Sequence, residues 1–433
     1  MIACWPPYMW RVGRCGFGVS DLVNSAKHVM RTGLVGALAL VLVACTSSGN
    51  TPTPPPQRPA TPDVTITPPP QNPADRNTSG FLRPRHLDAA EPVRVAILLP
   101  LSGGAAPVGD AMLNAAQLAL FEFDDPNVLL IPKDTSGDPA RAAQAAREAI
   151  SEGADIILGP LFASSVAAVA GPAQSAGVPV IAFSTDRNVA GGGVYLLSFL
   201  PEEDIERVVD FAVLEGHQRF AAMLPQSEYG QRVRNQFGQA VIARGGELAA
   251  TESYTPTTDG MLAPAERLAK LKDSYDVVLL PAGGTELQGL APLLPYYDVD
   301  PRQVKFIGTG LWDDPSVLRE PSLVGGWFAA PPPETRKAFQ DRYERVFGTK
   351  PHRISSLAYD AMSLSIALSG GQPGQRYTVS ELTAEDGFAG IDGVFRFTPE
   401  GLNERGLAVM EVRPGGFVVV SPAPTSLTGG PVF

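Results

Sequence analysis

The side chains best suited to chemistry in this chain are hydroxyls, carboxylates and aromatic rings that directly follow short apolar runs. Hydroxyls donate and accept hydrogen bonds, ionised carboxylates only accept them, and aromatic rings offer a flat face. Such a set is typical of a site that binds a small polar molecule, so we treat these residues as candidate ligand contacts. They are Ser102, Ser164, Ser165, Ser184, Thr185, Asp186, Tyr229, Thr285 and Trp312.

Catalytic and metal-binding patterns are missing from the sequence. It contains no Gly-x-Ser-x-Gly elbow, no Ser-x-x-Lys and no phosphate-binding glycine loop. The histidines His86, His217 and His352 have no second His or Cys at metal-ligand spacing. The adjacent carboxylates, such as Asp124-Asp125, fit turns and helix caps better than paired acid and base work. We therefore expect a protein that is not an enzyme and has no metal or cofactor.

The elements that position the candidate contacts form an alternation of strands and helices. The run Val93–Leu99 is almost entirely apolar, as expected for a strand buried on both faces of a parallel sheet. Asp138-Pro139 then predicts the capped start of a helix that stops at Gly153. A second alternation follows Pro201, and a hairpin is expected where Pro414-Gly-Gly turns the last two strands. The pattern predicts an α/β fold with right-handed crossovers between parallel strands.

The N-terminal region indicates export and lipid anchoring. An apolar stretch from Gly33 to Ala44 is too short to cross a bilayer but fits a signal peptide. It ends in Leu-Val-Ala-Cys45, which resembles the bacterial lipobox, so Cys45 is the expected lipidation site. Met30 offers an alternative start codon. Thr46 is not the aspartate that in enteric bacteria holds lipoproteins at the inner membrane, which favours the outer membrane, facing the periplasm.

Composition divides the remaining chain into a linker and one large domain. Residues 1–44 form the signal peptide and residues 45–92 the lipidated cysteine with a Pro- and Thr-rich linker. Residues 93–433 form the domain, with one lobe over about 93–200 and a second over about 201–330, the C-terminal segment being shared between them. The linker extends to at most about 145 Å. The domain is therefore expected to work well away from its membrane.

Charge excludes two kinds of partner. Residues 1–44 carry a net charge of +3, so their removal takes the chain from −11 to −14. An acidic chain of this kind gains nothing from phosphate neutralisation, which argues against nucleic acid. It also gains nothing from anionic lipid, so acyl chains must supply the membrane anchor.

Several segments together resemble the type 1 periplasmic binding fold, the branched-chain amino-acid-binding (leucine-binding) family in particular. They run from about Val93 to Val420 and are Leu98-Leu-Pro-Leu-Ser-Gly, Gly153-Ala-Asp-Ile-Ile-Leu-Gly-Pro-Leu, Gly177-Val-Pro-Val-Ile-Ala, Glu228-Tyr-Gly-Gln and Ala358-Tyr-Asp-Ala. The resemblance implies two doubly wound parallel-sheet lobes joined by hinge crossovers, with a ligand held at the strand ends. It makes Tyr229 the residue that stacks on the ligand.

Two positions depart from the amino-acid binders. Those proteins typically place a hydroxyl where Ala163 aligns and a threonine where Asp186 falls, and a carboxylate at Asp186 would repel a ligand carboxylate. The chain also resembles the penicillin-binding protein activators, lipoproteins of the same fold that contact peptidoglycan synthases, through Leu118-Ala-Leu-Phe, Asp134-Thr and Ile157-Leu-Gly-Pro-Leu-Phe-Ala. We therefore expect an activator whose partner is a penicillin-binding protein. The alternative is the solute-binding receptor of an ABC importer for amino acids or related small polar ligands.

Overall fold

The computed structural model describes residues 92–428. The predicted signal peptide, Cys45 and the linker lie outside the described residues, so their assignments stay predictions. Within residues 92–428, no helix is both long enough and apolar enough to cross a membrane.

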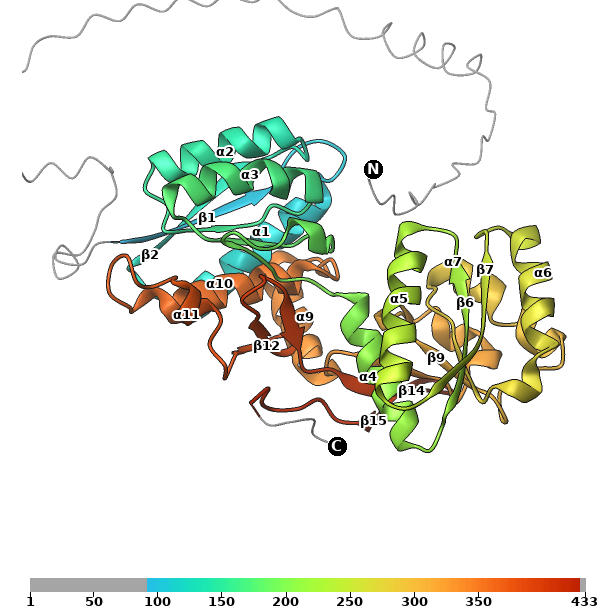
Figure 1. Cartoon of the computed structure of the whole chain (residues 1–433). Helices are drawn as coiled ribbons and strands as arrows, with labels where there is room; N and C mark the ends of the chain where they lie inside the picture. The colour runs from blue at the N-terminus through green and yellow to red at the C-terminus, as the bar shows by residue number, and fades with distance from the viewer. Residues whose placement is uncertain (1–91, 429–433) are drawn as a thin grey trace, which may run out of the picture. The chain divides into compact units, whose positions relative to one another are not determined.

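The first lobe is built on a five-stranded, entirely parallel sheet (Figure 1). Its strand order is β2-β1-β3-β4-β5. The strands are β1 (Val93–Leu99), β2 (Val128–Asp134), β3 (Ile156–Leu158), β4 (Val180–Ala182) and β5 (Val194–Leu196). The expected buried strand at Val93–Leu99 and the parallel pairing are both confirmed.

Helices cover both faces of this sheet. On one face α2 (Pro139–Ser151) and α3 (Ala163–Ala176) pack through small side chains such as Ala142 and Val166. The other face is covered by α1 (Ala106–Phe123), α9 (Pro333–Phe347), α10 (Ser355–Ser369) and α11 (Val379–Leu382). Asp138 caps α2 by accepting a hydrogen bond from the Arg141 backbone nitrogen at 2.8 Å, which confirms the predicted helix start.

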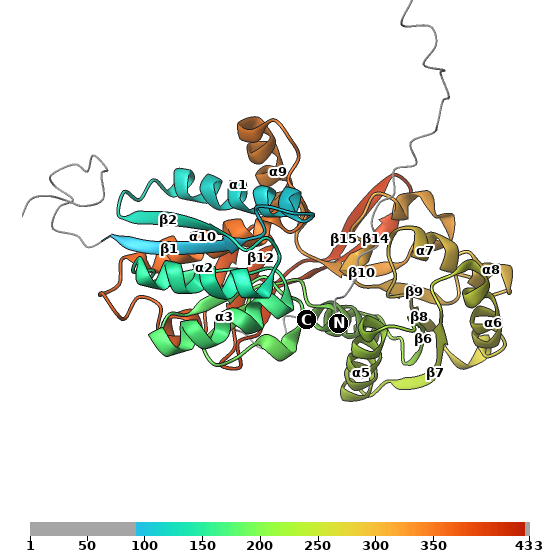
Figure 2. The same ribbon diagram turned by 90° about the horizontal axis from the view of Figure 1, so that it is seen from above.

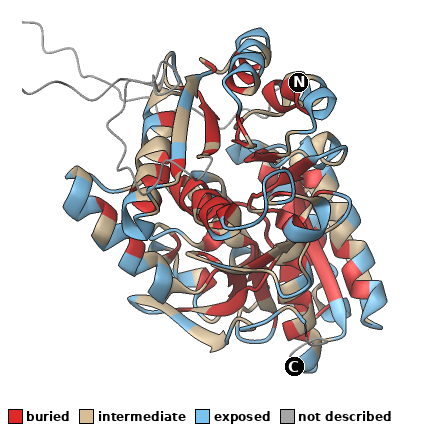
Figure 3. Cartoon of the chain, turned by 90° about the vertical axis from the view of Figure 1, so that its left-hand side faces the viewer, coloured by how far each residue is buried: buried red, intermediate tan, exposed pale blue. Residues whose placement is uncertain are grey.

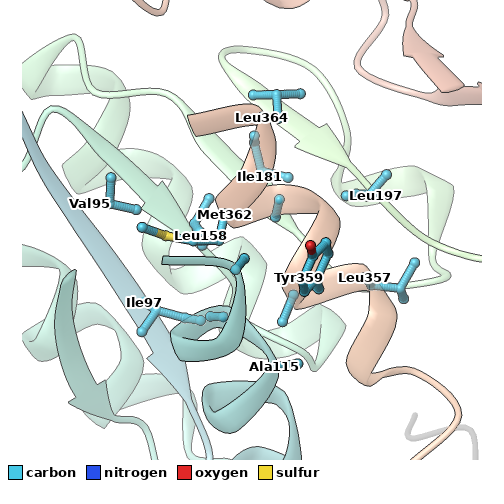
Figure 4. Packing of buried hydrophobic residues seen from close by; sticks show 14 of the residues in the cluster. Val95, Ile97, Ala115, Leu158, Ile181, Leu197, Leu357, Tyr359, Met362 and Leu364 are labelled. Carbon is cyan, nitrogen blue, oxygen red and sulfur yellow. The ribbon is translucent and has the colours of Figure 1, made fainter. Parts of the chain in front are cut away.

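Helix α10 comes from the C-terminal part of the chain yet fills the core of the first lobe. Its residues Leu357, Met362 and Leu364 belong to the same buried cluster as the sheet residues Val95 and Ile97 (Figure 4). Figure 3 shows how buried residues gather on the strands and on the inner faces of the helices. Because this helix follows the second lobe in sequence, the chain has to return to the first lobe to complete its core.

The second lobe is built on a seven-stranded sheet of order β15-β14-β10-β9-β8-β6-β7 (Figure 2). The strands are β6 (Arg219–Pro225), β7 (Glu247–Tyr254), β8 (Val277–Leu279), β9 (Lys305–Gly308), β10 (Trp327–Ala330), β14 (Ala408–Arg413) and β15 (Gly416–Ser421). The predicted C-terminal hairpin is confirmed as β14 and β15. At this edge the sheet is mixed, because β14 pairs antiparallel with β10 and the hairpin then adds β15.

Two helix layers cover this second sheet as well. One face carries α4 (Pro201–Leu214) and α5 (Glu228–Ala243), and the other carries α6 (Thr258–Ala269), α7 (Gly284–Leu290) and α8 (Leu293–Tyr296). A small antiparallel sheet of β11 (Phe388–Gly390), β12 (Gly393–Phe397) and β13 (Asn403–Arg405) packs on the first lobe through Phe395 and Phe397. The chain thus passes between the lobes after β5, after β10 and after β13.

A close approach between Trp312 and Gly308 depends on the absence of a side chain. A Cβ atom at Gly308 would lie 2.2 Å from the Trp312 ring, far inside van der Waals contact. We predict that Gly308→Ala destabilises the protein by roughly 1–3 kcal/mol or more, because the indole would have to leave its packed position. Urea unfolding should show a lower midpoint at an unchanged slope.

Gly238 in α5 supplies the matched control for this prediction. A Cβ atom there would lie 3.8 Å from Leu248 Cδ2, an ordinary van der Waals contact, so Gly238→Ala should stabilise the protein by about 1 kcal/mol through helix propensity. Equal midpoints for wild type and Gly308→Ala would contradict the packing argument.

Candidate functional site

The carboxyl ends of the first-lobe strands carry polar loops, as the sequence predicted. Ser102 follows β1, Asp134 ends β2, and Ser184 follows β4. Because the strands are parallel, these ends lie along one edge of the sheet, where open α/β sheets place their ligands.

Asp134 organises the Ser102 side of this edge. Its Oδ2 accepts hydrogen bonds from the hydroxyls of Ser102 at 2.6 Å and Ser136 at 3.0 Å. Its Oδ1 accepts from the backbone nitrogens of Leu101, Ser102 and Ser136 at 2.9, 3.2 and 2.7 Å. Partial burial alone would raise the pKa of this carboxyl, but the hydrogen bonds lower it to about 2. The Ser102 hydroxyl therefore donates to the protein itself.

The remaining candidates of the first lobe differ in what they present to solvent. Ser164 and Thr185 are exposed and free to meet a ligand. Ser165 is buried, and its hydroxyl has no hydrogen-bond partner among the described residues. Ser184 is also buried and accepts a hydrogen bond from the Asp186 backbone nitrogen at 3.1 Å. Asp186 in turn accepts from the backbone and side-chain nitrogens of Asn188 at 3.0 and 2.9 Å. The side chains of Ser184 and Asp186 thus stabilise the turn that follows β4.

The second lobe brings a half-buried group of polar side chains to its strand ends. The hydroxyl of Tyr229 lies 3.2 Å from that of Thr309, and burial raises the pKa of this tyrosine. Asp204 accepts a hydrogen bond from the Gly310 backbone nitrogen at 2.9 Å. Burial raises the pKa of Asp204 to about 7, although this hydrogen bond and the charge of Arg353 oppose the shift.

A second tyrosine extends this group. The Tyr254 hydroxyl donates to Glu286 at 2.6 Å, and Thr285 beside that glutamate is exposed. The charges of Glu286 and Asp204 both contribute to the raised pKa of Tyr229, so the two tyrosines and two carboxylates share one environment. Sequence reasoning found Tyr229 and Thr285 but missed Asp204, Glu286 and Thr309. The available signal was that these residues flank strand ends or begin helices.

Trp312 does not take the predicted role of a ligand contact. Its ring is completely buried, and its indole nitrogen donates to the Leu280 carbonyl oxygen at 3.0 Å. The ring packs against Gly308 and lies near Phe328, with the two ring centroids 6.2 Å apart. A side chain with no exposed surface belongs to the core of the second lobe. Sequence alone placed it in a strand-end loop but could not show which way it points.

The arrangement offers groups that can form hydrogen bonds. Its side chains are hydroxyls, phenols and carboxylates that bond to one another and to backbone nitrogens. Among residues 92–428, no cluster of three or more His, Cys, Asp or Glu is placed to hold a metal ion. Two surface pockets of about 310 Å³ each lie elsewhere, one at the start of α5 and one between α1, α9 and the loop 349–352. Neither is lined by a predicted contact residue.

Two doubly wound lobes, three crossovers and polar strand ends define a protein of the type 1 periplasmic binding class. The family model described as periplasmic binding protein matches residues 92–416, and the chain belongs to that family. The expected resemblance to branched-chain amino-acid-binding proteins is thereby confirmed at the level of fold and family.

Solved structures of similar fold include an ABC transporter substrate-binding protein and a leucine-binding protein. A substrate-binding protein of an ABC transporter from Sphaerobacter thermophilus aligns with a TM-score of 0.62 at 21% identity, covering 76% of this chain and 97% of that one. A leucine-binding protein from Thermotoga maritima aligns with a TM-score of 0.54 at 20% identity, covering 76% and 98%. At these identities the likeness is one of fold alone.

Curated relatives match over shorter stretches. An uncharacterised protein of Rickettsia prowazekii is 21% identical over 227 residues, which are 51% of this chain and 61% of the relative. The penicillin-binding protein activator LpoA of Vibrio cholerae is 25% identical over 158 residues, which are 35% of this chain and 26% of the relative. The chain thus spans about three fifths of the first relative and about a quarter of the second.

The Asp134 network leads to a prediction about stability and pH. The folded-state pKa of about 2 lies below the ordinary value of 3.8, so the ionised group stabilises the fold above about pH 4 and loses this effect as the pH falls towards 2. Because the carboxylate is exposed, we expect Asp134→Asn to lower the free energy of unfolding at pH 7 by only about 1 kcal/mol. Chemical unfolding at several pH values measures this difference.

Asp138→Asn is the control, because asparagine caps a helix as well as aspartate does and should change little. The deficit of Asp134→Asn should shrink between about pH 4 and pH 2. A deficit that stays constant over that range would contradict the assigned network.

Proposed function

We propose that this chain is a lipid-anchored, non-enzymatic protein of the cell envelope that activates a peptidoglycan synthase of the penicillin-binding protein class. It uses a ligand-binding fold as an interaction module. The proposal concerns the partner and the mode of action, and both go beyond the family assignment.

The observation that carries the proposal is that first-lobe groups expected to receive a ligand carboxylate are occupied or replaced. The Ser102 hydroxyl donates to Asp134, and the Ser184 hydroxyl accepts from the backbone of Asp186. Ala163, where amino-acid binders typically carry a hydroxyl, has none. Asp134 and Asp186 add negative charge near these strand ends, which repels a carboxylate. These features support an interaction role over amino-acid capture.

The relative from Vibrio cholerae supports the same direction, because it is named a penicillin-binding protein activator. The predicted linker adds a physical argument. A linker of residues 46–92 lets the domain reach at most about 145 Å from its anchor, far enough to enter the cell wall from the outer membrane. Tethering also raises the effective concentration of a weakly bound partner when the linker spans the gap.

A solute receptor for an ABC importer is the second candidate. The pairing of Tyr229 with Thr309 favours it, because a half-buried tyrosine held near the strand ends suits stacking on a small ligand. The ABC transporter substrate-binding protein and the leucine-binding protein of similar fold point the same way. A receptor requires a permease, so permease and ATPase genes beside this one would favour the receptor over the activator.

The activator function predicts a physical complex and a faster synthase. The mature chain, beginning at Cys45, should capture bifunctional penicillin-binding proteins from detergent-solubilised envelopes. It should also raise the rate of glycan polymerisation by the purified synthase in a saturable manner. Heat-denatured protein is the control. Failure to capture any synthase together with an unchanged polymerisation rate would rule out the activator.

Lipid anchoring predicts a different localisation for one cysteine variant. Cys45→Ser should leave the membrane pellet and appear in the soluble periplasmic fraction, because acyl chains are the expected anchor. Cys15→Ser is the matched control and should remain membrane-bound, since Cys15 lies in the predicted signal segment. Separation of inner and outer membranes should place the wild type in the outer one. Membrane retention of Cys45→Ser would disprove the anchor.

A further inference from the structure

Arg405, at the end of β13, carries a buried charge that is only partly satisfied. Its side chain is 1% exposed, and its guanidinium carbon lies 5.4 Å from the ring centroids of both Phe199 and Phe395. One terminal nitrogen, Nη1, donates to the Asp392 carbonyl oxygen at 3.2 Å and lies 3.9 Å from Asp360 Oδ2. The other two nitrogens, Nε and Nη2, are buried and have no hydrogen-bond partner among the described residues.

These two nitrogens form the edge of the guanidinium group that holds a carboxylate through two parallel hydrogen bonds. The same chain uses that geometry elsewhere, where Arg232 donates from Nε and Nη2 to the two oxygens of Glu202 at 2.9 and 2.8 Å. A buried charged donor without a partner is costly, so the empty edge of Arg405 calls for an acceptor.

Glu203 is the complementary group. It lies in the first turn of α4, and its Oε2 accepts a hydrogen bond from the side chain of Asn403 at 3.3 Å. Asn403 and Arg405 are two positions apart on β13 and therefore face the same side of that strand. The second oxygen of Glu203, Oε1, is buried without a hydrogen-bond partner among the described residues.

Glu203 and Arg405 interact electrostatically without a direct contact. No hydrogen bond or ion pair within 4.0 Å joins them in the described part of the chain. Burial raises the pKa of Glu203 well above its ordinary value, and the charge of Arg405 is the largest influence opposing that shift. An unsatisfied donor edge and an unsatisfied acceptor thus lie near each other on one side of β13.

The two groups belong to different lobes. Arg405 lies on the small sheet whose Phe395 and Phe397 are part of the first-lobe core. Glu203 belongs to α4, whose Ile205, Val208 and Val209 are part of the second-lobe core. Any rotation of one lobe against the other about the crossovers therefore changes the distance between Glu203 and Arg405.

We propose that Glu203 and Arg405 form a hinge latch, which is open in this structure and closes as a bidentate ion pair in a second arrangement of the lobes. The latch is a property of the fold itself, so it does not depend on whether the domain activates a synthase or binds a solute.

Closing the latch is coupled to a proton. In the open state burial favours the protonated Glu203, whereas pairing with the guanidinium favours the carboxylate. Raising the pH therefore favours the closed state. The other charged groups around the pair are Asp204, Glu206, Glu404, Arg353, Asp360 and Asp392. Of these, Asp204 and Asp360 also have pKa values raised by burial to about 7, and burial raises the pKa of Glu206, so their responses have to be separated from that of Glu203.

Spin-label distances between the lobes test the latch. The full chain, with Cys4, Cys15 and Cys45 changed to serine, receives labels at Ala167→Cys on α3 and Ala263→Cys on α6, two exposed positions. We expect two distance populations, with the closed-to-open ratio rising by up to about tenfold per pH unit, the limit for one coupled proton. Glu203→Gln should lose the closed population, because an amide cannot form the ion pair, and any pH response left in it belongs to Asp204, Glu206 or Asp360.

Glu206→Gln is the matched control, one turn further along α4, and should keep both populations. Glu203→Asp serves as a second variant whose shorter side chain should weaken the latch without removing the charge. Circular dichroism and thermal unfolding establish that each variant is folded. A single distance population at every pH, or identical distributions for the wild type and Glu203→Gln, would overturn the proposal. Internal water would then be the expected hydrogen-bond partner of Arg405 Nε and Nη2.

Discussion

The constraint on which the structure depends is that each of two parallel sheets has to bury both of its faces. Four apolar clusters meet this requirement, two for each sheet. Burying apolar surface is the main favourable term in folding, and a parallel sheet exposed on either face would lose it. Because helices occupy both faces, the strand ends are the part of each sheet left open to polar side chains. The first lobe lacks enough helices of its own, and α10 returns from beyond the second lobe to cover it.

That return explains why the lobes are joined by three crossovers rather than one. Helix α10 is buried on nearly all sides, and the β11–β13 sheet accompanies it, so the C-terminal segment cannot belong to one lobe alone. Three chain passages bring backbone and charged groups into the region between the cores. Arg353 pairs there with Asp392 at 3.1 Å, and Arg336 pairs with Asp313 across from the first lobe to the second. Charges in such a place are tolerated only when paired, which makes an unpaired edge like that of Arg405 informative.

Sequence patterns predicted the elements whose signals are local. The apolar run of β1 and the Asp138-Pro139 cap of α2 were found because strand burial and helix capping depend on neighbouring residues. The four-residue strand β10 and the three-residue strands β11 and β13 were missed, because their pairing is set by distant partners. The candidate site likewise has features with a local signal and features that depend on tertiary packing. Strand-end loops were predictable, but the five hydrogen bonds to Asp134 and the inward orientation of Trp312 arise from tertiary packing.

The same reasoning bears on how a protein of this family can change its role. A ligand or a partner shifts two lobes only by as much as it prefers one arrangement over the other. If the strand ends do not receive a ligand carboxylate, because Asp134 and Asp186 add negative charge there, the preference has to come from another surface. The crossovers and the buried charges beside them do not depend on which ligand or partner the domain binds. They are needed because the C-terminal segment completes the first-lobe core. A two-lobed binding fold can therefore lose its solute and keep its hinge, which leaves the hinge for a protein partner to use.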